Sequence, residues 1–335
     1  MYTNDNKTAF LKSSNSDIYN ITQGVGYSGT DLNLAVSDSE NGDKLIFFAD
    51  IVMPKINDRD VSTYSAALTI PSNKNISIDL NGHTLSNKGI YDDTIEIKEG
   101  ASVYMYNGKI KGESDINLGT TTLINSGKVI LNNVNVYKGD SNHSTEHIKN
   151  LGEMEIINCE KIRGSYIDGN TEAINNSGKI KITNSNVNGY IKNEGECTMI
   201  GGTCYQVIND YRHSIINGSN KSIILNIDGV KLSGDDHGGK SIMVRNGICN
   251  IAGGSGSVEG IYLEKGTLNI GNGKTVTNYP EITDGVTYEG GVFNFYDGYI
   301  SSGGLTIYNN LTVNVPDGYQ LKYSNNNQTV KLEKK

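Results

Sequence analysis

The sequence predicts an all-β protein whose chain winds as a single-stranded parallel β-helix, a solenoid of stacked coils. Three observations support this: an unusual composition, a repeated segment, and alternation of apolar and polar residues within the repeat. Of 335 residues, 40 are glycine and 43 asparagine, whereas proline occurs 4 times and tryptophan is absent. Glycine and asparagine adopt left-handed backbone conformations most readily, so this composition predicts many short turns.

A short segment centred on a glycine repeats along the chain. The best copies are residues 123–131, 148–156, 174–182 and 191–199. Further copies centre on Gly247, Gly266 and Gly291, with one at Gly100 that has an insertion and one at 225–227 that lacks the glycine. Successive copies lie roughly 17 to 28 residues apart, the spacing of solenoid coils, which predicts roughly ten to eleven coils.

The strand after each glycine alternates as a half-buried strand should. Two and four positions after the glycine the residues are apolar, as at Val129 and Leu131 or Leu268 and Ile270. The position between them is mostly polar, and its residues are Glu155, Lys181, Thr198, Asn250, Asn269 and Asn294, with Ile130 as the exception. Equivalent residues stacked about 4.8 Å apart would form a continuous apolar interior.

Two further columns support this register. Two positions before the glycine, four copies carry Asn125, Asn150, Asn176 and Asn193, which predicts a ladder of hydrogen-bonded amides. One position after the glycine, the charges alternate as Lys128, Glu153, Lys179 and Glu196. Neighbouring coils would then place opposite charges side by side.

The ends of the chain differ from its middle. Residues 31–38 are predicted to form a short amphipathic helix that covers the open end of the apolar stack. Residues 305–315 and 319–332 are predicted as the last strands, on either side of a turn at 316–318. We therefore expect an N-terminal arm and cap over 1–60, coils over 61–315, and a C-terminal capping strand and tail over 316–335.

Composition and charge narrow the function classes. With 29 basic and 37 acidic residues the net charge is −8, which disfavours nucleic-acid binding. No apolar run reaches the ~18 residues of a membrane span, so we expect no membrane insertion. Residues 1–20 lack the apolar core of a signal peptide, so we expect another export route or a longer parent chain.

The motif Asn-Gly-Asp at 41–43, the segment Ile-Ser-Ile-Asp-Leu-Asn-Gly-His-Thr-Leu at 76–85, and the strands at 103–108 and 293–298 together carry a family resemblance. Over residues 30–330 the chain resembles right-handed β-helices of the pectate-lyase-like superfamily, and is most similar to surface proteins of gut bacteria. The resemblance implies a right-handed coil and an extracellular place on a cell or virion surface. It implies no single activity, because this fold carries lyases, hydrolases, adhesins and phage tailspikes.

The four cysteines are Cys159, Cys197, Cys204 and Cys249. The register places Cys197 and Cys249 in one column with Leu225 between them, about 10 Å apart, beyond the ~7 Å of a disulfide. Cys159 and Cys204 fall in different columns, and only a Cys197–Cys204 bond stays open. We predict four free thiols that pack as small apolar side chains. No CxxC motif is present, so no zinc site or other cofactor is expected.

Histidines offer little evidence of a metal site. His143 and His147 have the i, i+4 spacing of a metal pair on a helix, but the segment between coils favours a loop. His83 follows Asn-Gly and is interpreted as a turn residue. No metal ligand is assigned.

The segment Gly-Asp-Asp-His-Gly-Gly-Lys at 234–240 contains the best candidates for chemistry. Polygalacturonase-like hydrolases use paired aspartates and a Gly-His-Gly segment, because two carboxylates can divide acid and base roles. Here these elements are fused, their family partners are missing, and glycine and aspartate are ordinary loop residues. We therefore assign no catalytic residue and keep Asp235, Asp236 and His237 as candidate binding residues.

A lyase site is harder to place. The aligned carboxylates Glu153, Glu155 and Glu196 each have a lysine neighbour, as on a charge-balanced surface. Asp92, Asp93 and Asp168 are interpreted as isolated loop acids, with no arginine beside them. A polysaccharide lyase or glycoside hydrolase is therefore the alternative function and not the first.

Binding is the first functional prediction. Tyrosine occurs 20 times against 5 phenylalanines. Some tyrosines near polar columns or turns should be exposed, and these are Tyr104, Tyr106, Tyr137, Tyr190, Tyr205, Tyr262 and Tyr296. Aromatic rings beside amides and carboxylates suit carbohydrate. We predict a non-catalytic, adhesin-like module that binds a surface glycan or a surface protein, and the pattern also allows a homo-oligomer.

Overall fold

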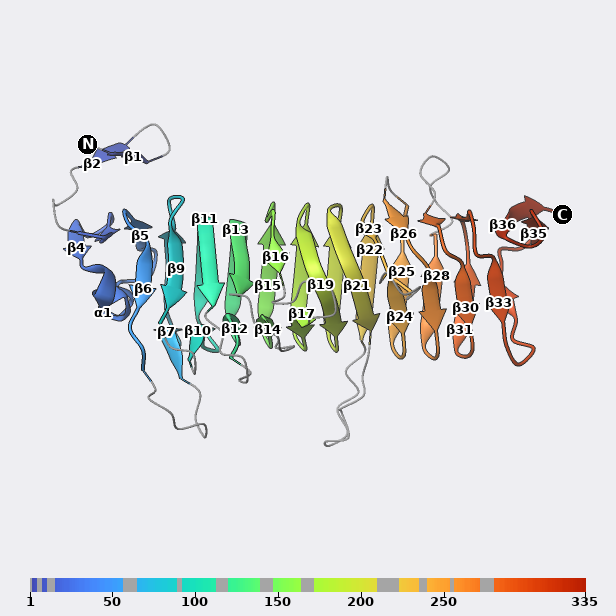
Figure 1. The fold of residues 1–335 in the computed structure, drawn as a ribbon, viewed down its shortest axis with the longest axis horizontal. Helices are drawn as coiled ribbons and strands as arrows, with labels where there is room; N and C mark the ends of the chain where they lie inside the picture. The colour runs from blue at the N-terminus through green and yellow to red at the C-terminus, as the bar shows by residue number, and fades with distance from the viewer. Residues whose placement is uncertain are drawn as a thin grey trace. The chain divides into compact units, whose positions relative to one another are not determined.

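The computed structural model describes residues 2–4, 8–10, 16–56, 65–88, 92–112, 120–138, 147–163, 172–209, 223–234, 240–253, 256–271 and 280–335. The chain divides into two compact units, Met1–Ile167 (unit 1) and Asp168–Lys335 (unit 2). Each unit consists mainly of short parallel strands (Figure 1). This all-β, mostly parallel arrangement is the one that the repeat predicts, and it fits a β-helix or solenoid.

Unit 1 contains three sets of strands, and within each set the neighbours are parallel. The first sheet comprises β5 (Lys44–Phe47), β8 (Asn75–Asp79), the first halves of β11 (Ser102–Gly112) and β13 (Lys128–Lys138), and β15 (Glu153–Ile157). The second comprises β6 (Ile51–Met53), β9 (Thr84–Asn87), the second halves of β11 and β13, and β16 (Ile162–Arg163). The third comprises β7 (Ala66–Ile70), β10 (Asp93–Ile97), β12 (Leu123–Asn125) and β14 (Ile148–Asn150).

The N-terminal part of unit 1 is antiparallel and helical. Its elements are β1 (Tyr2–Asn4), β2 (Thr8–Phe10), β3 (Ile18–Asn20), β4 (Val25–Tyr27), the 3₁₀ helix η1 (Gly29–Asp31) and α1 (Leu32–Asp38). The strand β3 pairs with both β4 and β5. The helix α1, predicted over 31–38, buries Leu32, Ala35 and Val36.

The helix α1 also closes a strand edge. Asn33 donates a 2.8 Å hydrogen bond to the carbonyl of Ala67 and accepts one of 3.3 Å from the backbone N–H of Thr69, both on β7. One side-chain amide thus bonds the backbone as a neighbouring strand would. The helix is therefore held beside β7 by an amide as well as by its buried apolar residues.

Left-handed residues bend the chain from the first sheet into the second. On β11 and β13 these are Asn107 and Asn133, with φ of 58° and 55°, at equivalent positions. In unit 2 the bend falls at Asn184, Gly201 and Gly229, with φ of 48°, 62° and 63°. Asparagine and glycine tolerate this conformation at the lowest cost, which explains part of the composition.

Unit 2 repeats the three sets, again with parallel neighbours. The first sheet comprises β18 (Lys179–Thr183), β20 (Glu196–Ile200), β22 (Ile224–Asp228), β25 (Ile248–Ile251), β28 (Thr267–Ile270), β31 (Val292–Phe295) and β34 (Val313–Asn314). The second comprises the starts of β19 (Asn186–Asn193) and β21 (Thr203–Asn209), then β23 (Lys231–Leu232), β26 (Ser257–Val258), β29 (Glu281–Ile282) and β32 (Tyr299–Ile300). The third comprises β17 (Glu172–Asn176), the ends of β19 and β21, β24 (Ile242–Val244), β27 (Ile261–Leu263), β30 (Val286–Tyr288) and β33 (Leu305–Ile307).

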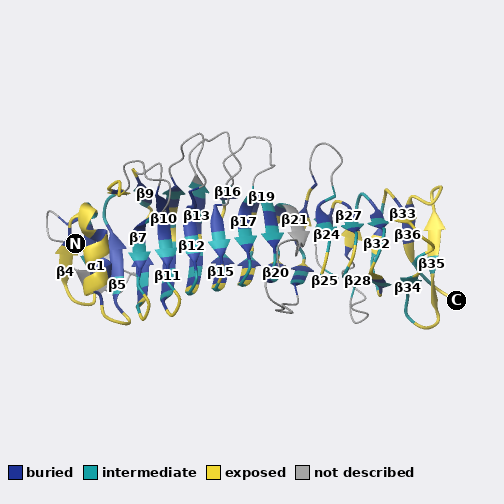
Figure 2. Cartoon of the chain, turned by 90° about the horizontal axis from the view of Figure 1, so that it is seen from below, coloured by how far each residue is buried: buried dark blue, intermediate teal, exposed yellow. Residues whose placement is uncertain are grey.

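The C-terminal end differs from the prediction of a single strand over 319–332. Instead, β35 (Tyr319–Ser324) and β36 (Thr329–Lys334) form an antiparallel hairpin, and β36 pairs antiparallel with β32. The turn is made by Asn325, Asn326 and Asn327, all left-handed. Three consecutive residues that tolerate this conformation reverse the chain there. Most of β35 is exposed (Figure 2).

The inward columns form the core, as the alternation predicts. Cys197, Leu225 and Cys249 lie on adjacent strands of unit 2 in the predicted order and are buried. Further along the same sheet, the rings of Phe293 and Phe295 pack edge to face with centroids 6.0 Å apart. Interdigitated apolar side chains of this kind hold the three sheets together.

The predicted inner asparagines are hydrogen-bonded and fully buried. In unit 1, Asn125 Nδ2 donates to Asn150 Oδ1 at 2.8 Å. In unit 2, Asn176 Nδ2 donates to Asn193 Oδ1 at 2.8 Å. A buried amide needs partners, and stacking supplies an acceptor for the N–H groups of Asn125 and Asn176, whereas Oδ1 of Asn125, next to Ile97, has no partner among the described residues.

The glycine of the repeat has two separate functions. A Cβ at Gly152 would lie 2.1 Å from the carbonyl oxygen of Gly127, and one at Gly195 would lie 2.1 Å from that of Gly178. These positions need glycine because successive turns approach closely. At Gly291 a φ of 85° adds a second reason.

Candidate functional site

The candidate binding residues Asp235, Asp236 and His237 lie outside the described residues. The ends of their segment are held in place. The backbone N–H of Gly234 donates to Glu259 Oε2 at 2.9 Å, and Lys240 Nζ lies 2.6 Å from the carbonyl oxygen of Asp284 and 3.1 Å from its carboxylate. These contacts place Gly234 and Lys240 beside the turns that contain Glu259 and Asp284 in unit 2.

The histidine pair cannot be assembled into a site from the described residues. His143 falls outside them, whereas His147 is completely buried at the start of β14. His83 lies in the predicted turn, donates its backbone N–H to Leu80 and has Nδ1 3.4 Å from Asp50 Oδ1. Within the described ranges, no three histidine, cysteine or carboxylate side chains gather as a metal site would require.

The acids of unit 1 that were interpreted as isolated loop residues are structural. Asp92 and Asp93 are buried, and Asp93 is the first residue of β10. Asp92 accepts from the N–H of Ile56 at 2.9 Å, and Asp93 accepts from the N–H of Thr121 at 2.6 Å. The interpretation as loop acids is wrong for Asp93, which lies on a strand, whereas Asp92 lies in the bend before β10, and both carboxylates accept a backbone N–H. Asp168 lies outside the described residues.

The alternating charges after the glycine form the expected neighbours. Lys128 Nζ lies 3.7 Å from Glu153 in unit 1, and Lys179 Nζ lies 3.4 Å from Glu196 in unit 2. Exposed pairs of this kind balance charge and contribute little stability. All four side chains are exposed to solvent.

All four cysteines are free and buried, as predicted. Burial raises the pKa of Cys197 and raises that of Cys249 to about 12. A thiol with a raised pKa is a poor nucleophile and a poor metal ligand at neutral pH. These residues belong to the core.

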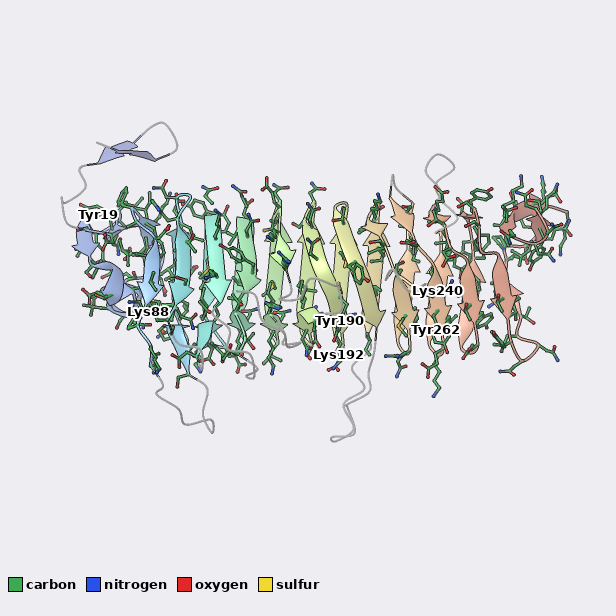
Figure 3. All side chains as sticks on the ribbon, viewed as in Figure 1. Tyr19, Lys88, Tyr190, Lys192, Lys240 and Tyr262 are labelled. Atoms are coloured by element: carbon green, nitrogen blue, oxygen red, sulfur yellow. The ribbon has the colours of Figure 1, made fainter. Side chains whose placement is uncertain are left out.

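Of the seven tyrosines expected near the surface, only Tyr296 is exposed, at 40% of its full accessible area. The others are half-buried. Tyr104 and Tyr106 stack on each other at 4.8 Å, and Tyr190 and Tyr262, marked in Figure 3, donate to Glu172 and Glu289. Exposed rings that sequence reasoning missed lie in the last part of unit 2, at Tyr299, Tyr308, Tyr319 and Tyr323.

The outward polar column of unit 2 forms a second, outer asparagine ladder. It consists of Asn226, Asn250, Asn269, Asn294 and Asn314, on β22, β25, β28, β31 and β34 (Figure 1). Each Nδ2 donates to the Oδ1 of the preceding rung, over 2.8, 2.7, 2.7 and 2.8 Å from Asn250 to Asn314. At the other end Asn226 donates to Thr198 Oγ1 at 3.2 Å.

The outer ladder keeps hydrogen-bonding capacity for a ligand. A primary amide has two N–H donors and an oxygen with two lone pairs, and the ladder uses one of each at an internal rung. The internal rungs are partly exposed. Each therefore offers one donor and one acceptor, repeated about every 4.8 Å. The ladder also fixes each amide in place, so a ligand would not have to order it.

Beside this ladder lies an open depression of about 310 Å³. Its lining residues are Asn250, Ile251, Ala252, Asn269, Gly271 and Tyr296. Two ladder amides and an exposed aromatic ring thus converge on one hollow. Gly271, left-handed with φ of 74°, leaves no room for a side chain there, because a Cβ would lie 2.5 Å from the Cβ of Asp297.

Comparisons with protein-family models, with curated proteins and with solved structures found no match to this chain. In the described part of the chain, no helix is both long and apolar enough to cross a bilayer.

Proposed function

We propose that this chain is a right-handed parallel β-helix of the pectate-lyase-like kind, with roughly ten to eleven coils. Support comes from the parallel pairing, the in-register columns and the buried asparagine stacks. The family resemblance of the sequence adds the handedness. An extracellular place, on a bacterial cell or phage particle, follows from the same resemblance.

The proposed function is non-catalytic binding of a surface glycan on the first sheet of unit 2. The observation that carries it is the depression in which Tyr296 meets the outer-ladder amides of Asn250 and Asn269. Sugars have apolar faces that stack on aromatic rings and hydroxyls that both donate and accept hydrogen bonds. Each requirement has a matching group in this hollow.

The test is glycan-array screening of the whole chain, followed by calorimetry with the oligosaccharide that binds best. Tyr296→Ala should weaken binding by about tenfold or more, because it removes the ring. Tyr319→Ala, which removes a ring of similar exposure from β35, is the matched control and should leave affinity unchanged. Equal loss in both variants, or no bound glycan at all, would overturn the proposal.

The enzyme alternative has a separate readout. Incubation with acidic and neutral polysaccharides should release no product from either the wild type or Asp236→Asn. Product from the wild type that disappears in Asp236→Asn would replace the binding proposal by a lyase or hydrolase. Surface proteins are screened in parallel as a comparison. A protein that binds the chain when no glycan does would favour a protein ligand over the proposed glycan.

A further inference from the structure

The face that carries the outer ladder is almost free of charge. On β22, β25, β28, β31 and β34, the only charged residue is Asp228, at the end of β22. On the two preceding strands of the same sheet, β18 and β20, Lys179 and Glu196 form an ion pair. Charge is therefore present on the first sheet of unit 2 before the ladder begins and is nearly absent along it.

One side of the outer ladder is an apolar column. Ile224, Ile248, Thr267 and Val292 lie in register two positions before the ladder residues. Ile248 is 37% exposed and Val292 is 43% exposed. Alternation along a strand places these residues on the same outer face as the amides. The ladder thus runs between apolar side chains and the depression at Tyr296.

These two features bear on the charge of the ligand. A carboxylated sugar bound over the ladder would lose water and gain no cation from the five strands, while Asp228 would repel it. An uncharged sugar needs hydroxyl partners and contact for its C–H groups, which the amides and the apolar column supply.

The repeat of the ladder bears on the ligand's length and direction. The five rungs are related by four steps of about 4.8 Å, so they span about 19 Å. Each internal rung presents the same spare donor and acceptor in the same orientation. A polymer of identical units that runs across the strands would meet the same groups at successive rungs.

We propose that the ligand is an uncharged polysaccharide that lies along the outer ladder, across successive strands. This inference rests on the proposed glycan binding and adds the ligand's charge and its path.

The experiment is calorimetry on the full chain with two oligosaccharide series of increasing length, neutral glucose or N-acetylglucosamine oligomers and galacturonate oligomers. Neutral oligomers should bind at least about tenfold more tightly than galacturonates, at both low and physiological salt. Their affinity should rise with length until the oligomer spans about 19 Å. Affinity that does not depend on length would overturn the path along the ladder.

Two variants test the charge argument. Asn269→Asp replaces an amide by a carboxylate in the ladder and should weaken both series, the galacturonates more than the neutral oligomers because the new carboxylate repels them, whereas Asn186→Asp, on the second sheet, should change neither. If Asn269→Asp fails to fold, Val292→Lys serves instead: its cation should raise galacturonate affinity. Galacturonates bound as tightly as neutral oligomers by the wild type would overturn this inference alone. Binding of neither series would overturn the proposed function itself.

Discussion

Asn125 Nδ2 donates a 2.8 Å hydrogen bond to Asn150 Oδ1 from a side chain with no exposed surface. The same amide also donates to the carbonyl of Glu153 at 2.9 Å. Buried in an otherwise apolar stack, it links neighbouring strands of unit 1 through side chain as well as backbone. Removing the Asn125 amide would leave Asn150 Oδ1 and the carbonyl oxygen of Glu153 without this donor.

Asn125→Ala should therefore lower the free energy of unfolding by about 1–3 kcal/mol, measured by chemical denaturation. Lys128→Ala, three positions along the chain, removes only an exposed ion pair with Glu153 and should change stability by less than about 0.5 kcal/mol. Equal effects of the two substitutions would contradict a special role for the buried amide.

Gly152→Ala should destabilise unit 1 by about 1–3 kcal/mol, because the added Cβ would lie 2.1 Å from the carbonyl oxygen of Gly127. Thermal unfolding followed by circular dichroism measures the loss. Ser126→Ala, which adds no atoms at the neighbouring turn, is the control. A variant as stable as the wild type would show that the turns are not closely stacked.

The phenol of Tyr190 should lose its proton at a higher pH than an ordinary tyrosine, because its pKa is raised. Burial first, and then Glu172, raise its pKa to about 12 from an ordinary 10.0. Because the folded protein then holds this proton more tightly than the unfolded chain, the free energy of unfolding should fall as the pH rises from about 10 to about 12. Ultraviolet difference titration, with Tyr190→Phe to assign the transition, measures the pKa.

The two causes of that shift can be separated. Glu172→Gln removes the carboxylate and should lower the pKa of Tyr190, yet leave it above 10, because burial is the larger cause. A pKa that returns fully to 10 in this variant would assign the whole shift to the carboxylate.

The thiols should be unreactive in the folded protein. All four are buried, and burial raises the pKa of Cys197 and Cys249. A thiol reagent should modify the native chain slowly and should titrate four thiols after denaturation. Fewer than four in the unfolded, unreduced protein would indicate a disulfide.

The register of the core was predictable because it depends on local repetition. Apolar residues two and four positions after each glycine lie on one face of a strand whatever surrounds them. The inner asparagines and alternating charges followed from the same alignment. What that alignment missed was the reason for several glycines, since the 2.1 Å approach at Gly152 exists only once two turns are stacked.

The candidate site was predictable only in part. The polar column through Asn250, Asn269 and Asn294 was visible, and the copy at 225–227 places Asn226 in it, but its extension to Asn314 needed the strand pairing. Tyrosine exposure was harder to predict, because the half-buried rings of Tyr190 and Tyr262 donate to carboxylates of neighbouring turns of the chain, Glu172 on β17 and Glu289 just after β30. These pairings join positions distant in sequence, and no local pattern reveals them.

The most direct test of the account follows the asparagine side chains themselves. Selectively ¹⁵N-labelled protein should be titrated with a neutral oligosaccharide, and the side-chain NH₂ signals recorded by nuclear magnetic resonance. If the glycan binds along the outer ladder, the signals of the outer-ladder amides should shift, most at Asn250 and Asn269, and those of the buried amides of Asn125 and Asn176 should not. Binding that leaves the outer-ladder signals unmoved would contradict this binding mode.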